Sequence, residues 1–205
     1  FYKKKKINKN INLIDRFQIS KNFKKETYFG NFISKKDNFL IVPSLLSYKP
    51  KNILFFVNKK NFFLKETFLN YSDIIFIGFS LIFKRIKLNQ KYLKFNFNNL
   101  IKEEFKFDNN LRSIIFSYIN YFFFKNLVKK NFQIKKVYSW YENQIIDKGW
   151  SLGVNKYFSK AQYIGYQGST LHPQFFNLST TKQEFLSGVV PKNIILIGKQ
   201  YLKNR

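Results

Sequence analysis

A run of three polar residues, Glu142, Asn143 and Gln144, directly follows an aromatic stretch that we predict to be a strand over residues 136–140. A carboxylate at the start of a helix can accept hydrogen bonds from backbone N–H groups, which hold it ionised. From that place Glu142 could act as a general base or hold a substrate hydroxyl group. The alternative is that it caps its helix or pairs with a lysine. We expect Asp147, further along the same helix, to be an exposed residue.

A second polar run, Gly165-Tyr166-Gln167-Gly168, lies where the next predicted strand turns into a loop. Glycine lets a backbone approach a ligand closely, and the glutamine amide can hydrogen-bond hydroxyl groups. The alternative is a plain tight turn. The spacing differs from the glycine pattern of dinucleotide sites, so we expect no such site. His172 lies on the same loop and is either structural or a contact to sugar or phosphate.

The order of the predicted elements brings both runs to one edge of a sheet. A strand, a helix and a strand are predicted over 136–140, 143–158 and 161–166, and a further strand over 193–198. This order predicts an α/β fold, with an open, mostly parallel, Rossmann-like sheet flanked by helices. Ligands bind beyond the carboxyl ends of the strands in such sheets. Both polar runs fall at those ends.

The first two thirds of the chain supply further elements. We predict buried strands over 38–46 and 52–57, and helices over 72–86 and 110–129. The first of these helices is expected to have Ser72 or Asp73 as its N-cap. Its apolar part, 74–83, is about ten residues long, against the roughly 20 needed to cross a bilayer. It is therefore predicted to be a buried or interfacial helix.

Composition limits the possible chemistry. The chain has 205 residues, no cysteine and one histidine, which excludes disulfides, thiolate metal sites and multi-histidine centres. The formal net charge is +26, but only four of the 37 basic residues are arginine. Lysine is encoded by A/T-rich codons, so part of this charge reflects base composition. The charge indicates either a solvated surface with some attraction to anionic membranes, or RNA binding.

The last third of the chain resembles the surface-carbohydrate biosynthesis proteins, which are similar to glycosyltransferases with two Rossmann-like domains, the GT-B architecture. The resemblance covers Val137–Tyr201 and extends weakly to residues 28–32 and 38–46. Its motifs are WYENQ (Trp140–Gln144), DKG (Asp147–Gly149), AQYIGYQG (Ala161–Gly168) and SGVVPKNIILIG (Ser187–Gly198). Relatives often have histidine directly after GYQ, where this chain has Gly168.

The resemblance implies a division of the chain and a set of site residues. Residues 1–190 are expected to form the N-terminal, acceptor-side domain, and 191–205 the linker and first strand of a truncated second domain. The chain, which lacks methionine, is expected to be a fragment that is inactive alone. The residues implied to face the interdomain cleft are Glu142, Asn143, Gln144, Gly165, Tyr166, Gln167 and Gly168.

The implied function is glycosyl transfer in surface polysaccharide assembly. A nucleotide sugar would be the donor and a saccharide or lipid-linked hydroxyl the acceptor, with no cofactor and no metal. The expected location is the cytoplasm, with peripheral contact to anionic lipid at the inner face of the cell membrane. The alternative from another class is a basic RNA-binding, ribosomal-type protein from an A/T-rich genome, although we expect no nucleic-acid partner.

Overall fold

The structure is a computed structural model that describes residues 10–18, 39–45, 50–57, 62–83, 91–92, 95–96, 111–168 and 179–196. Its centre is a five-stranded sheet in the order β2-β1-β5-β6-β7, with every neighbouring pair parallel. The strands are β1 (Asn10–Gln18), β2 (Phe39–Leu45), β5 (Gln133–Trp140), β6 (Gln162–Gln167) and β7 (Asn193–Leu196). The predicted α/β, Rossmann-like fold with a parallel sheet is confirmed.

The strand order reverses between β1 and β5. The chain passes from β1 outward to β2, and then returns to the other side of β1 to form β5, β6 and β7 in succession. Crossovers therefore leave in opposite directions on the two sides of this point. In doubly wound sheets the carboxyl ends of the two strands at such a reversal flank the ligand crevice. The fold therefore makes the carboxyl ends of β1 and β5 the expected place for a ligand crevice.

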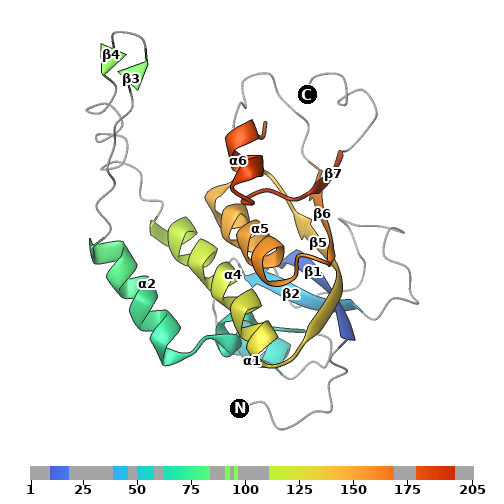
Figure 1. Cartoon of the computed structure of the whole chain (residues 1–205). Coiled ribbons are helices and arrows are strands. Elements are labelled where there is room, and N and C mark those ends of the chain that lie inside the picture. Colours follow the sequence, from blue (N-terminus) through green and yellow to red (C-terminus); the bar gives the residue numbers. More distant parts are fainter. Residues whose placement is uncertain are drawn as a thin grey trace.

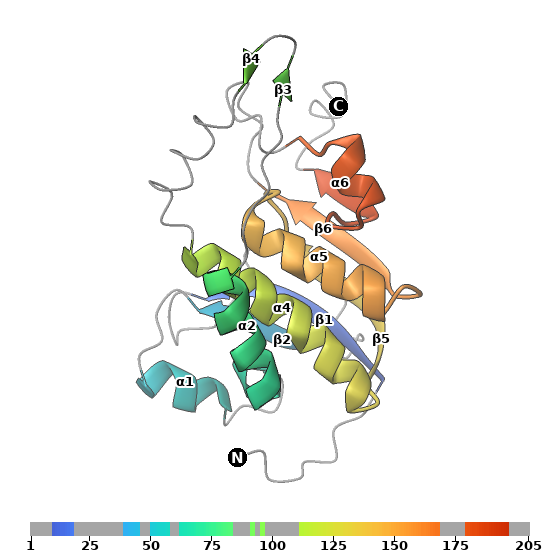
Figure 2. The ribbon, with the colours of Figure 1, turned by 60° about the vertical axis from the view of Figure 1, so that its left-hand side comes forward.

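Helices pack against one face of the sheet (Figures 1 and 2). The helices α4 (Leu111–Lys129) and α5 (Ile145–Tyr157) lie side by side on it, with the short helix η2 (Lys65–Phe68) next to α4. Outside α4 lies α2 (Tyr71–Phe83), so α2 is one layer further from the sheet. Two further helices, α1 (Pro50–Val57) and α6 (Lys182–Leu186), and a small antiparallel pair, β3 (Lys91–Tyr92) with β4 (Phe95–Asn96), complete the described elements.

The main hydrophobic core lies between the sheet and the α4–α5 pair. Leu13 of β1 and Val137 of β5 face it and are fully buried. The rings of Phe124 and Trp150 meet there nearly at right angles, with centroids 4.9 Å apart. Such aromatic burial supplies a large share of the apolar area removed from water. The core thereby fixes α5, whose first turn adjoins the carboxyl end of β5.

Most predicted elements are confirmed with small shifts of their ends. The predicted strands 38–46, 136–140 and 161–166 correspond to β2, β5 and β6, and the predicted helices 110–129 and 143–158 correspond to α4 and α5. The predicted helix over 72–86 is α2, which is described as far as Phe83.

The prediction of a strand over 52–57 is wrong, because these residues belong to helix α1. A short apolar run is compatible with either structure when its periodicity is considered alone. Pro50 stands in the first turn, where its missing N–H costs no hydrogen bond. The helix then buries Phe56 against Phe62 and exposes Leu54, as one face of a helix would.

Two further features depart from expectation. The N-cap prediction for α2 is wrong: the helix begins at Tyr71, and Asp73 instead accepts a hydrogen bond from the backbone N–H of Asn70 at 3.0 Å. Strand β1 was not predicted, since Asn12, Asp15 and Arg16 interrupt its apolar pattern.

Strand β7, which was expected to open a second domain, pairs in parallel with β6 as the edge of this same sheet. The division of the chain at residue 191 stays a prediction. None of the helices within the described ranges is long and apolar enough to cross a membrane.

Candidate functional site

The two predicted polar runs lie at the same edge of the sheet, on neighbouring strands. Strand β5 ends at Trp140, and the backbone N–H of Tyr141 still donates to the carbonyl of Tyr166 on β6 at 2.9 Å. This bond carries the strand pairing into the loop that holds Glu142. The carboxyl ends of β5 and β6 and the N-terminus of α5 therefore converge at one place.

Glu142 is half-buried in this loop, and its carboxylate accepts a hydrogen bond from the side-chain amide of Gln144 at 2.8 Å. The backbone bonds that were expected at Glu142 are made by another carboxylate. Asp147 accepts from the backbone N–H groups of Glu142 and Gln144, each at 3.0 Å. Asp147 was predicted to be exposed, which is wrong: it turns back from the first turn of α5 to hold the loop.

The surroundings of Asp147 raise the pKa of its carboxyl group. Burial raises the pKa of this carboxyl group to about 7, and the negative charges of Asp15 and Glu142 act in the same direction. The two backbone hydrogen bonds lower the pKa but do not offset the burial. Asp147 is therefore a proton-exchanging group near neutral pH, directly beside the loop of Glu142.

Asn143 joins the loop to two helices, α5 and α6. Its backbone has a φ of 59°, a conformation that asparagine tolerates better than most residues. Its side-chain oxygen accepts from the hydroxyl of Tyr141 at 2.7 Å and from the ammonium of Lys148. Lys148 also pairs with Glu184 of α6 at 2.5 Å. Burial raises the pKa of Glu184, but the bonds from Lys148 and from Thr181 more than offset this and lower it to about 2.

The end of β6 is packed closely by the protein's own side chains. A Cβ atom on Gly165 would lie 2.6 Å from Pro191 and 3.1 Å from the Cβ of Tyr141. A Cβ atom on Gly168 would lie 2.3 Å from the ring of Trp140. Glycine is thus required at both positions by packing alone. Gln167 is buried, and Tyr166 is half-buried with its ring against Trp140.

A buried polar group that the sequence analysis missed lies at the end of β1. Asp15 accepts a hydrogen bond from the hydroxyl of Ser44 at 2.8 Å, and Lys65 donates to the same hydroxyl at 3.3 Å. Asp15 and Lys65 are buried, Ser44 is partly buried, and the ammonium of Lys65 is 5.5 Å from the ring of Trp150. Burial raises the pKa of Asp15, while the charge of Lys65 and the bond from Ser44 oppose the shift. The sequence did carry one signal for this buried group, because the charged residue Asp15 interrupts an otherwise apolar run.

A second buried group connects β5, α5 and β6. The hydroxyl of Tyr163 lies 3.1 Å from that of Ser139 and 2.9 Å from that of Ser151. Burial raises the pKa of Tyr163, and the charges of Asp147 and Asp15 contribute in the same direction. This phenol therefore stays protonated and structural.

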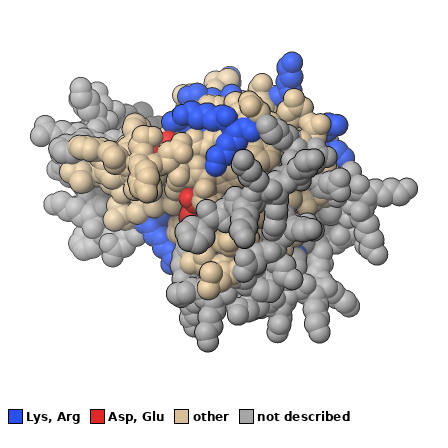
Figure 3. Space-filling model, turned by 90° about the horizontal axis from the view of Figure 1, so that it is seen from below, with Lys and Arg blue, Asp and Glu red and all other residues tan. Residues whose placement is uncertain are grey.

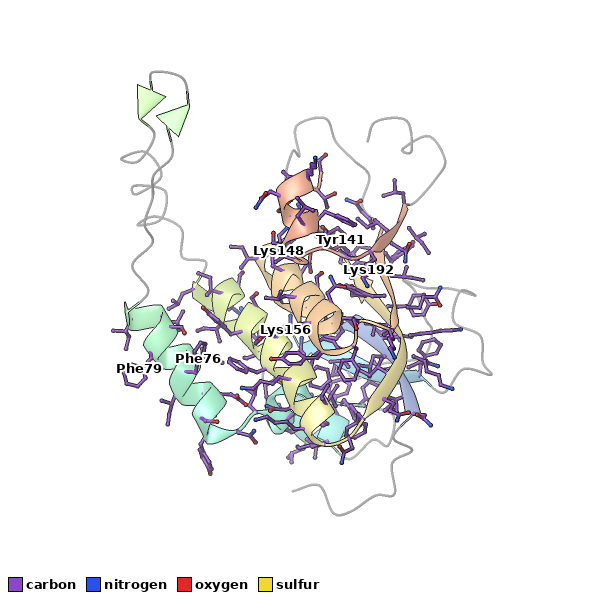
Figure 4. All side chains as sticks on the ribbon, in the orientation of Figure 1. Phe76, Phe79, Tyr141, Lys148, Lys156 and Lys192 are labelled. Carbon is purple, nitrogen blue, oxygen red and sulfur yellow. The ribbon has the colours of Figure 1, made fainter. Side chains whose placement is uncertain are left out.

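Figure 4 shows Tyr141 and Lys148 at the upper end of the sheet and of α5, the end at which this candidate site lies. His172 lies outside the described residues. Within the described ranges there is no group of three or more side chains suited to hold a metal ion. The arrangement offers two carboxylates, several amides and hydroxyls, and a lysine, which together can bind hydroxyl groups and transfer a proton.

Comparisons of this chain with protein-family models, with curated proteins and with solved structures found no match. The class that the fold defines is an α/β protein with a Rossmann-like parallel sheet.

Proposed function

We propose that this chain is the acceptor-side domain of a glycosyltransferase of surface polysaccharide assembly. The donor is a nucleotide sugar, and the acceptor is a hydroxyl group of a saccharide or of a lipid-linked sugar. The protein works in the cytoplasm, peripherally at the inner face of the cell membrane. The observation that carries the proposal is the placement of Glu142 at the carboxyl end of β5, beside the point where the strand order reverses.

Glu142 acts as the general base. Its carboxylate takes the proton of the acceptor hydroxyl as that oxygen attacks the anomeric carbon of the donor sugar. The bond from that carbon to the nucleoside diphosphate breaks, and the diphosphate leaves. Because Gln144 donates to the carboxylate of Glu142, the group is held in place at the loop. Such a base contributes roughly 100-fold to 10,000-fold to the rate.

Asp147 supports this role from below the loop. Its two bonds to the backbone fix the position of Glu142, and its own ionisation near pH 7 adds a second negative charge beside the base. Asn143, Gln144, Tyr166 and Gly168 contact the acceptor, whereas Gly165 and Gln167 are buried and support the end of β6. Asn143 is held by Tyr141 and Lys148, so its amide is already oriented before a substrate arrives.

The test is an assay of the full-length protein of which this chain is proposed to be the acceptor-side domain. Release of nucleoside diphosphate is measured from a set of nucleotide sugars, with saccharide and lipid-linked acceptors. Glu142→Gln is expected to lower kcat by about 100-fold or more with little change in the KM of the acceptor. Glu66→Gln in η2 removes the same charge away from the sheet edge and should keep normal turnover. Near-normal turnover of Glu142→Gln removes Glu142 as the base, and no release from any donor overturns the proposal.

A second candidate, RNA binding, is favoured by one observation at the opposite end of β5. Basic side chains gather on the lower end of the molecule (Figure 3). The end of α4 and the start of β5 carry Lys129, Lys130, Lys135 and Lys136, three of them exposed. RNA binding would weaken by several powers of ten over one decade of salt. A filter-binding titration with RNA and a sugar-polymer control separates this candidate from glycosyl transfer.

A further inference from the structure

Helix α2 exposes the larger part of its apolar surface. Its outer face, as we call it here, consists of six side chains that are each more than half exposed: Tyr71, Ile74, Ile75, Phe76, Phe79 and Ile82. Apolar residues that are exposed singly are ordinary, but a contiguous group of this kind marks an interaction surface. Figure 4 shows Phe79 pointing away from the rest of the molecule, while Phe76 lies on the side toward α4.

The opposite side of α2 packs against α4. Ile77 is buried against Ile119 and Phe122 of α4. Asp73, the only acidic residue in the helix, is 1% exposed and binds Asn126 and Lys125 at 2.6 and 3.3 Å. The outer face is therefore free of negative charge, and α2 is apolar on the side where a surface helix normally carries its polar residues.

The charge of the chain selects the kind of partner. Directly after α2 the sequence continues Lys84-Arg85-Ile86-Lys87, and the whole chain carries +26. Lysine and arginine beside an apolar helix face attract the phosphate groups of anionic lipids, while the apolar side chains enter the boundary of the acyl region.

We propose that the outer face of α2 inserts into the surface of an anionic lipid bilayer and holds the protein there. The helix has 13 residues and a length of about 20 Å, so it lies in the plane of the interface. This inference rests on the peripheral location proposed above and names the element responsible for it. It does not depend on the identity of the sugar or of the base.

The absence of cysteine from the sequence allows a direct test. Ile82→Cys on the outer face and Leu186→Cys on α6 each create a single labelling site, at side chains that are 76% and 68% exposed. Each variant carries a polarity-sensitive fluorophore and is mixed with vesicles of phosphatidylglycerol and phosphatidylcholine, or of phosphatidylcholine alone. We expect a blue shift for the label at position 82 with the anionic vesicles, and little change at position 186. Equal responses at both positions overturn the proposal.

Cosedimentation with the same vesicles measures the contribution of the apolar side chains. The double variant Phe79→Ser with Ile82→Ser is expected to bind at least about tenfold more weakly than the wild type. The matched control, Phe185→Ser with Leu186→Ser on α6, should bind as the wild type does. Unchanged binding of the α2 variant overturns the proposal, as does self-association through α2 in the absence of vesicles. No donor or acceptor sugar is present, so the result is independent of glycosyl transfer.

Discussion

The side-chain oxygen Oδ2 of Asp147 lies 3.0 Å from the backbone nitrogen of Glu142, so the first turn of α5 holds the loop that carries the proposed base. The same oxygen accepts from the N–H of Gln144 at 3.0 Å. Two donors on one carboxylate leave the loop little freedom to move. A substitution of Asp147 is therefore expected to alter the position of Glu142 through its backbone, although the two side chains are not bonded to each other.

The first prediction concerns the pH dependence of stability. The pKa of Asp147 rises from 3.8 to about 7 on folding, so between these values the folded state binds more protons than the unfolded state. The contribution of Asp147 to the free energy of unfolding therefore falls as the pH rises from about 4 to about 7. For one proton the slope is at most about 1.4 kcal/mol per pH unit. Urea unfolding across this window measures it.

The matched variant for this prediction is Asp147→Asn, which keeps the size of the side chain and removes the titration. The pKa of Asp15 is raised as well, so the wild type keeps other pH-dependent contributions. The difference between wild type and Asp147→Asn isolates the one group. Equal slopes for the two proteins would contradict the assigned shift.

The second prediction concerns the buried charges of Asp15 and Lys65. Lys65→Met leaves the carboxylate of Asp15 buried without its cation and should destabilise the protein by about 3 to 5 kcal/mol. The loss should become smaller as the pH falls, because the pKa of Asp15 is raised and its protonation removes the buried charge. Adding Asp15→Asn should recover a large part of the stability. Thermal and urea unfolding of the three proteins test this, and a double variant less stable than Lys65→Met alone would refute it.

The third prediction compares the same substitution in two helices. A Cβ atom on Gly149 of α5 would lie 1.8 Å from the backbone oxygen of Ser117, whereas one on Gly78 of α2 would meet nothing within 4 Å. Gly149→Ala must push α4 and α5 apart and should cost about 3 kcal/mol. Gly78→Ala should stabilise by about 0.5 to 1 kcal/mol, because alanine loses less conformational freedom in a helix. Changes of the same sign in urea unfolding would show that the α4–α5 contact is looser than described.

The fourth prediction concerns the attachment of α2 to α4. Asn126 is buried and donates to Asp73 at 2.6 Å and to the carbonyl of Phe68 at 2.9 Å. Asn126→Ala leaves both acceptors without this donor and should cost about 2 to 4 kcal/mol.

A double-mutant cycle with Asp73→Ala is expected to give a coupling energy of about 1 kcal/mol or more between the two side chains. Burial raises the pKa of Asp73, but the bonds from Asn126, Asn70 and Lys125 more than offset this and lower it. The stabilisation should therefore be lost as the pH falls below the ordinary range of aspartate. Additive effects of the two substitutions would argue against a direct interaction.

Local pattern sufficed for much of the fold. The strands β5 and β6 and the helix between them were predicted because their apolar spacing and their end residues lie within a few neighbours of one another. From their order followed the parallel sheet, and with it the edge at which the two polar runs lie. Local pattern predicted the wrong element for the apolar run 52–57, because the spacing of apolar residues in so short a run does not distinguish a helix from a strand.

The sequence by itself determined the α/β class, the order of the elements in the last third, and the end of the sheet at which Glu142 and Gln167 lie. The tertiary structure alone decided that Asp147 holds the loop, that Lys65 and Asp15 share the hydroxyl of Ser44, and that the outer face of α2 is exposed. The physical reason is distance along the chain. Lys65 and Asp15 are separated by many residues, with β2 between them in the chain, so their shared contact with Ser44 follows from the strand order and the packing of η2. Burial of a side chain depends on what packs over it, which no window of neighbouring residues contains.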